Sequence, residues 1–124
     1  MVTLEQFRYC PTHSTHPPFC YDFHYVKPGM VAIFGDNGSG KSTLAQLMAG
    51  WYPDFLPGEI TGTGTLLGTP IGRLPLNEQS ATIQLVQQSP YLQLSGCTFS
   101  VEEEVAFGPE NLCLAEKEIM APWP

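Results

Sequence analysis

Residues Gly35 to Thr43 read Gly-Asp-Asn-Gly-Ser-Gly-Lys-Ser-Thr, which fits the pattern G-x-x-x-x-G-K-[ST]. This spacing is typical of a P-loop, in which glycines let the backbone approach phosphate oxygens and a lysine neutralises their charge. We expect Lys41 to reach the β- and γ-phosphates of a nucleotide, Ser42 to bind Mg²⁺ through its hydroxyl, and Thr43 to contact the α-phosphate. A glycine-rich turn with a structural role only is the alternative.

The residues on either side of the loop predict a strand and a helix. Residues 30–34 form an apolar run after the turn residues Pro28 and Gly29, which favours a buried strand. From Leu44 onward, apolar residues recur at helical spacing, and Gly50 is placed to end the helix at its C′ position. The loop would therefore lead into a helix N-terminus, where unpaired N–H groups and the helix dipole attract an anion.

Size and composition set limits on the fold and on the class of protein. With 124 residues the chain can build one modest core, and its 14% of charged residues argues against disorder. The net charge of −7 and the scattered basic residues argue against a nucleic-acid-binding surface. No segment has the roughly twenty apolar residues of a membrane span, and no secretory leader pattern begins the sequence. We therefore expect a cytosolic or peripheral protein.

Cys10, His13, His16 and Cys20 could in principle supply four zinc ligands. Their spacing, C-x₂-H-x₂-H-x₃-C, differs from the common zinc modules. The intervening prolines and hydroxyl residues favour an ordinary exposed loop between two strands. We favour the loop over the metal site, and we expect all four cysteines of the chain to be free thiols.

Local patterns predict the remaining elements. Aromatic and β-branched residues predict strands at residues 2–9 and 19–26, a glycine-rich strand and turn at 58–68, and a short strand at 82–86. Prolines between Trp51 and Gly58 exclude a helix there.

Residues 100–103, Ser-Val-Glu-Glu, have the form of a capping box at a helix start. The predicted helix runs to Phe107 and stops at Gly108-Pro109. Glu102 to Glu104 would favour the positive end of this helix rather than serve catalysis or bind a metal.

Two later stretches are more specific than the P-loop. Residues 85–90 read Leu-Val-Gln-Gln-Ser-Pro, and residues 98–112 read Thr-Phe-Ser-Val-Glu-Glu-Glu-Val-Ala-Phe-Gly-Pro-Glu-Asn-Leu. Together they resemble the Q-loop region of ABC transporter ATP-binding subunits, most closely those of energy-coupling-factor importers for vitamins and for cobalt or nickel. The resemblance implies an α/β fold, namely part of a P-loop NTPase core with an antiparallel β subdomain. It covers residues 1–119 and leaves residues 120–124 as an irregular tail.

The resemblance also implies roles for individual residues. Tyr9 takes the place of the aromatic that stacks on adenine, although a strand tyrosine that packs on the sheet is an equal alternative. Gln88 aligns with the Q-loop glutamine, which contacts Mg²⁺ or the attacking water, and Gln87 is the neighbouring alternative. Lys41 and Gln88 would then act in catalysis, and Ser42 and Gln88 would bind the metal. The nucleotide-binding set would consist of Tyr9, Gly35, Asn37, Gly38, Ser39, Gly40, Lys41, Ser42 and Thr43, with Asp36 and Asn37 shaping the turn.

The 124 residues also depart from the family pattern. They contain no Leu-Ser-Gly-Gly-Gln signature, no apolar strand ending in Asp-Glu, no D-loop and no switch histidine. Residues 94–96 begin like a signature, but Cys97 and Thr98 follow, too close to the Q-loop. We therefore expect the N-terminal half of a domain, truncated before the signature and the Asp-Glu strand. It should bind ATP and Mg²⁺ better than it hydrolyses ATP, because the carboxylates that hold the metal and polarise water are missing.

The function implied by the resemblance is that of an ATP-binding subunit that powers solute uptake. Such a subunit works in the cytoplasm at the inner face of the membrane, with membrane-embedded subunits and a second ATP-binding domain as partners. A non-catalytic truncated product or interaction fragment is the alternative. A small P-loop kinase ranks last, because neither an acceptor site nor a lid is recognisable. The transported solute is not indicated.

Overall fold

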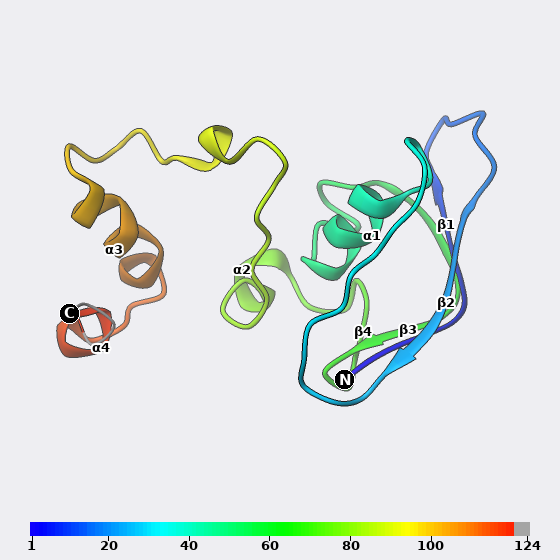
Figure 1. Ribbon diagram of the computed structural model, residues 1–124, viewed down its shortest axis with the longest axis horizontal. Helices are drawn as coiled ribbons and strands as arrows, with labels where there is room; N and C mark the ends of the chain where they lie inside the picture. The colour runs from blue at the N-terminus through cyan, green and yellow to red at the C-terminus, as the bar shows by residue number, and fades with distance from the viewer. Residues whose placement is uncertain (121–124) are drawn as a thin grey trace. The chain divides into compact units, whose positions relative to one another are not determined.

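A computed structural model describes residues 1–120 of the chain. The chain divides into two compact units, the first from Met1 to Leu85 and the second beginning at Val86. The first unit holds a β-sheet and the helix that follows the phosphate loop, and the second is built from helices (Figure 1).

The first unit contains a four-stranded antiparallel sheet in the order β2-β1-β3-β4. The predictions of strands at 2–9, 19–26 and 58–68 are confirmed. Aromatic and β-branched residues fit a pleated surface that is buried on one side, and β2 shows this as alternating burial along its length. The strands span β1, Val2–Pro11; β2, Phe19–Tyr25; β3, Gly58–Leu66; and β4, Thr69–Pro70.

The core of the first unit joins the central strand β1 to helix α1, Lys41–Met48. Leu4, Phe7 and Tyr9 of β1 and Leu44 and Leu47 of α1 are each 3% exposed or less. Burial of one such side chain stabilises a fold by about 1.5–3 kcal/mol. The cluster therefore holds α1, and with it the loop that precedes α1, against the sheet (Figure 1).

Helix α1 ends where the sequence predicts. The N–H of Gly50 donates to the Leu47 carbonyl at 3.3 Å, and the N–H of Trp51 donates to the Gln46 carbonyl at 3.1 Å. This pair of bonds is the Schellman motif, with Gly50 at C′. An irregular turn follows up to Gly58, so the predicted absence of a helix between Trp51 and Gly58 agrees with the structure. A short helix α2, Leu76–Gln79, was not predicted.

Two predicted strands are wrong. Residues 30–34 belong to no strand, and Met30 and Phe34 are 98% and 90% exposed. Residues 82–86 likewise form no strand, and Val86 is 80% exposed. A buried strand is stable only when neighbours accept and donate its backbone hydrogen bonds, and within residues 1–120 no strand pairs with either segment. Their apolar composition favours burial, but no strand in residues 1–120 provides the backbone pairing that a buried strand needs.

The second unit begins with the 3₁₀ helix η1, Pro90–Gln93, and continues with α3, Val101–Asn111, and α4, Glu116–Met120. The predicted capping interactions occur at the start of α3, although the Glu103 carboxylate bonds to Phe99, the residue before the N-cap Ser100. The Glu103 N–H donates to the Ser100 hydroxyl at 3.2 Å, and the Glu103 carboxylate accepts the Phe99 N–H at 2.8 Å.

The predicted end of this helix is wrong, because α3 passes through Gly108 and Pro109 to Asn111. A proline inside a helix removes one backbone donor, whereas the residues that follow can still bond. The Leu112 N–H reaches the Gly108 carbonyl at 3.1 Å, and α3 packs against α4. Met120, predicted to begin the irregular tail, instead ends α4, and the rest of that tail, residues 121–124, lies outside the described residues. None of the helices in residues 1–120 combines the length and apolar character needed to cross a bilayer.

Candidate phosphate-binding site

The P-loop residues form one continuous curve that ends at the start of α1. Within it, the Ser39 N–H donates to the Asp36 carbonyl at 3.1 Å, which closes a turn. Gly40 is the N-cap of α1, and no side chain caps the helix there. The N–H groups of the first helical turn therefore remain available to an anion placed inside the loop.

The Lys41 ammonium lies over the backbone of its own loop. Its Nζ donates to the Gly35 carbonyl at 2.6 Å, to the Asp36 carbonyl at 2.8 Å and to the Ser39 hydroxyl at 3.3 Å. These acceptors are neutral, and a phosphate oxygen in the same place would make shorter and stronger charge-assisted bonds. The cation is thus held against the loop backbone, where a bound phosphate would compete for its hydrogen bonds.

Strand β2 holds the last residue of the loop. The backbone of Gly40 has φ of 97°, and a Cβ at this residue would lie 2.5 Å from Cδ1 of Phe19. The Tyr21 hydroxyl donates to the Gly40 carbonyl at 2.7 Å, and burial raises the pKa of Tyr21 to about 12. The contact of Tyr21 with the loop was not predicted from the sequence. The alternation of Phe19, Tyr21 and Phe23 could have shown that it faces inward, but not which atom it reaches.

The other predicted phosphate-binding residues lie in the loop or on the first turn of α1, and most are exposed to solvent. Ser42 is exposed and Thr43 is half-buried on the first turn of α1, whereas Asn37, Gly38 and Ser39 are exposed in the loop. The structure therefore brings the predicted phosphate-binding residues together at the N-terminus of α1. Their individual contacts with a nucleotide stay predictions.

Tyr9 lies in the core of the first unit with 0% of its surface exposed. Its ring meets that of Tyr52 edge to face at 6.2 Å, and its hydroxyl donates to the Pro57 carbonyl at 2.8 Å. Burial is the main cause that raises its pKa above the ordinary value. These contacts fit the alternative in which Tyr9 packs on the sheet. Stacking on adenine would require the Tyr9 ring to leave the core. That role stays a prediction.

Gln88, the predicted Q-loop glutamine, is exposed at the start of the second unit, and Gln87 beside it is half-buried. The backbone N–H of Gln87 donates to the side-chain oxygen of Gln93 at 2.9 Å. The structure thus leaves the Gln88 side chain accessible, and its role at the metal stays a prediction.

Of the four residues considered as zinc ligands, Cys10 lies in β1, Cys20 lies in β2, and His13 and His16 lie in the loop between these strands. His16 stacks on Phe19 at 4.8 Å, and the Cys20 thiol faces the Pro18 carbonyl at 3.6 Å. All four cysteines are free thiols. Nowhere in residues 1–120 do three or more His, Cys, Asp or Glu side chains gather as metal ligands.

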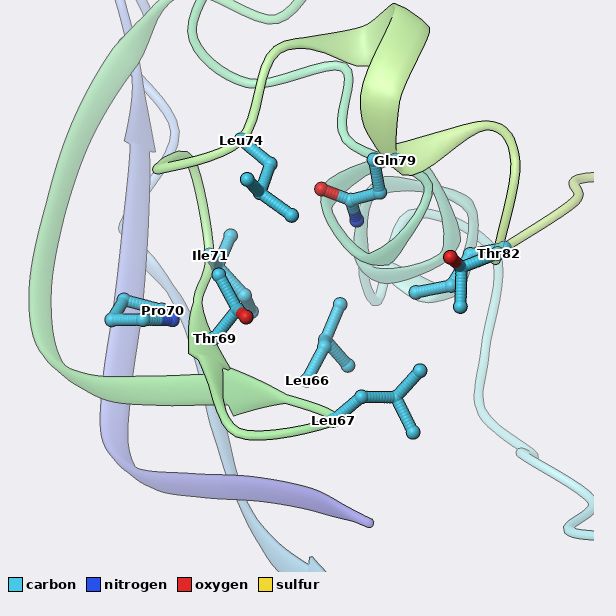
Figure 2. Close-up of a pocket in the computed structure, with 9 residues that line it drawn as sticks. Leu66, Leu67, Thr69, Pro70, Ile71, Leu74, Gln79 and Thr82 are labelled. Carbon is cyan, nitrogen blue, oxygen red and sulfur yellow. The ribbon is translucent and has the colours of Figure 1, made fainter. Parts of the chain in front are cut away.

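A separate cavity of about 200 Å³ lies beside the β3–β4 turn (Figure 2). Its wall is mainly aliphatic, with Leu66, Ile71 and Leu74 among its residues, and it contains neither a basic side chain nor the glycine-rich loop. Gln79, also in the wall, donates from Nε2 to the Met48 carbonyl at 2.6 Å at the end of α1. This cavity is therefore unsuited to phosphate, and the Gln79 side chain in its wall holds the end of α1 through the bond to Met48.

Comparison with known proteins supplies independent information. A family model described as "ABC transporter" matches residues 21–118. Three curated relatives are each named as a "Putative ABC transporter ATP-binding protein". They are 36% identical over 120 residues in Bacillus cereus, 40% over 100 residues in Streptomyces coelicolor and 38% over 120 residues in Methanosarcina mazei. The matches cover 96%, 79% and 96% of this chain but only 21%, 33% and 41% of those relatives. The chain thus spans between about a fifth and two fifths of their length.

Proposed function

This chain belongs to the family of ABC transporter ATP-binding proteins, and from that premise we propose that residues 35–43 bind the phosphates of Mg·ATP. One observation carries the proposal. The Lys41 ammonium lies over the loop carbonyls, while the first turn of α1 has no side-chain cap. A cation and a set of free N–H groups that face one enclosed space are the donors a triphosphate requires.

The proposed roles follow from the chemistry of each donor. Lys41 holds the β- and γ-phosphates, and the backbone of the loop from Gly35 to Gly40 surrounds them. Ser42 offers a hydroxyl oxygen that suits Mg²⁺, and Thr43 contacts the α-phosphate. The role of Gln88 at the metal rests on its alignment with the Q-loop glutamine. When bound, Mg²⁺ would neutralise charge on the phosphate oxygens. The positions of Lys41 and Ser42 at the start of α1 support these assignments.

We further propose that the transporter imports solute and belongs to the energy-coupling-factor type. The support is the stretch at residues 101–112, Val-Glu-Glu-Glu-Val-Ala-Phe-Gly-Pro-Glu-Asn-Leu. In such a transporter the chain works at the cytoplasmic face of the membrane with membrane-embedded subunits and a second ATP-binding domain. These partners and the direction of transport rest on that resemblance.

The 124 residues are proposed to bind ATP better than they hydrolyse it. Hydrolysis depends on a carboxylate that holds Mg²⁺ from a second side and on one that polarises the attacking water. No apolar strand that ends in an Asp-Glu pair occurs in these residues. A role as a non-catalytic interaction fragment is the second candidate, and the exposed apolar side chains of Met30 and Phe34 favour it.

Titration calorimetry with Mg·ATP on the purified 124-residue chain tests the proposal. We expect saturable binding, with affinity lowered at least about tenfold by Lys41→Ala, because charge-assisted bonds to a phosphate are each worth about 1.5–3 kcal/mol. Lys27→Ala is the matched control, since Lys27 is exposed after β2 and lies outside the P-loop.

Two results would contradict the proposal. One is a folded chain that does not bind Mg·ATP, and the other is a Lys41→Ala variant that binds as tightly as the Lys27→Ala control. Release of inorganic phosphate, measured on the same samples, tests the expectation of poor hydrolysis.

A further inference from the structure

The carbonyl of Gly40 accepts two hydrogen bonds that come from different parts of the first unit. The Leu44 N–H donates to it at 2.9 Å, which is the first bond of helix α1. The Tyr21 hydroxyl donates to the same oxygen at 2.7 Å from strand β2. The second bond connects the sheet directly to the end of the phosphate loop, across nineteen residues of sequence.

Tyr21 is held in place by its surroundings. It lies on the inward face of β2, and its ring centroid is 6.4 Å from that of Phe7 in the buried core. Phe19, on the same strand, also packs close to Gly40. A Cβ at Gly40 would lie 2.7 Å from the Tyr21 hydroxyl oxygen. With its pKa raised to about 12 by burial, the hydroxyl keeps its proton at neutral pH and remains a donor.

The peptide bond links this contact to the phosphate site. The carbonyl of Gly40 and the N–H of Lys41 belong to one planar unit, and in a trans peptide they point in opposite directions. The bond between these residues is trans. A donor that fixes the Gly40 carbonyl on the side of β2 therefore also fixes the direction of the Lys41 N–H, which points away from β2.

We propose that Tyr21 is a positioning residue for the phosphate loop, which holds the Gly40–Lys41 peptide so that the Lys41 N–H is aimed at a bound phosphate. This inference rests on the proposed function, because it needs a phosphate inside the loop. Tyr21 itself does not touch the nucleotide. It acts through the backbone of Gly40.

Tyr21→Phe removes the hydroxyl and keeps the ring. We expect the Kd for Mg·ATP to rise about 3- to 10-fold, since one net hydrogen bond is worth about 0.5–1.5 kcal/mol. Tyr25→Phe is the matched control, because Tyr25 lies on the same strand and its hydroxyl makes no hydrogen bond within residues 1–120. Its Kd should equal that of the wild type.

A second readout separates positioning from general stability. The amide proton of Lys41 should shift strongly when Mg·ATP saturates the wild type, as seen by NMR, and the shift should shrink in Tyr21→Phe even at saturation. Replacing Tyr21 with 4-aminophenylalanine, which keeps a donor at the same place, should restore both the shift and the affinity. Loss of stability alone would lower the melting temperature but leave the shift at saturation unchanged.

The outcomes distinguish this inference from the proposed function. If the wild type binds Mg·ATP and Lys41→Ala does not, but Tyr21→Phe matches Tyr25→Phe in Kd and in the Lys41 shift, the inference is wrong and the proposed function stands. If the folded wild type does not bind Mg·ATP at all, both are wrong.

Discussion

Gly40 shows how the requirements of a single residue place the phosphate loop. Its backbone is in the left-handed region, which costs a residue with a Cβ about 1–2 kcal/mol. It is also buried against Phe19 and Tyr21, so that a side chain has no room. The P-loop motif requires a glycine here for approach to phosphate, and the packing against β2 requires one independently.

Gly40→Ala should therefore lower the free energy of unfolding by at least about 2 kcal/mol, the backbone cost plus the displacement of Phe19. Gly38→Ala is the control, because Gly38 has φ of 79° but no atom within 4 Å of an added Cβ. It should suffer the backbone cost alone. Urea unfolding followed by circular dichroism measures both variants, and equal losses would show that contact with β2 does not restrict residue 40.

At the scale of elements, the side chain of Glu104 holds the loop before α3 through hydrogen bonds. The Glu104 carboxylate accepts the Ser95 N–H at 2.6 Å, the Thr98 hydroxyl at 2.6 Å and the Ser95 hydroxyl at 2.7 Å. These bonds, that of the Ser95 N–H first, hold the pKa of Glu104 below its ordinary value of 4.5. The capping box at Ser100 and Glu103 could be read from the sequence, whereas this second role of a first-turn glutamate could not.

The lowered pKa predicts how the loop responds to acid. A carboxyl group whose pKa is depressed by folding stabilises the folded state fully above its ordinary pKa and loses that contribution as the pH falls through the lowered pKa. Protection of the Ser95 amide from hydrogen exchange should thus be constant at neutral pH and fall below about pH 4.5.

Glu104→Gln should remove the pH dependence and leave the amide poorly protected throughout. Glu102→Gln, an exposed residue of the same helical turn, is the control and should behave like the wild type. Unchanged protection in Glu104→Gln would contradict the assignment of the carboxylate as the fastening group.

At the scale of the whole molecule, many large apolar side chains of the described residues are exposed to solvent. The segment at residues 30–34 leads straight into the P-loop, yet its backbone pairs with no strand described in residues 1–120. Met30 and Phe34 are almost fully exposed. An apolar segment with unpaired N–H and C=O groups is a template for association with another chain.

The 124-residue chain should therefore self-associate increasingly as its concentration rises, and Phe34→Ser should reduce this, because it makes the unpaired segment more polar. Phe55→Ser is the control, since Phe55 is also exposed, at 66%, but lies in a turn rather than an extended run. Sedimentation velocity measures the difference. Equal association in both variants would exclude residues 30–34 as the cause.

The sequence by itself determined what depends on near neighbours along the chain. The P-loop, the helix that follows it, the stop at Gly50 and the capping box at Ser100 each rest on contacts within a few residues. The strands at 2–9 and 19–26 were predictable because alternating aromatic residues fit a pleated surface. The resemblance to ABC transporter ATP-binding subunits followed from the local stretches at residues 85–90 and 98–112, and the family match over residues 21–118 supports it.

Only the tertiary structure decided what depends on partners distant in sequence. It placed Tyr9 in the core, brought Tyr21 to the Gly40 carbonyl, and showed that residues 30–34 and 82–86 are not strands within the described chain. The physical reason is the same in each case. A hydrophobic residue gains from burial wherever it occurs, but which atoms bury it, and whether its backbone finds a pairing strand, is set by segments that the local pattern does not contain.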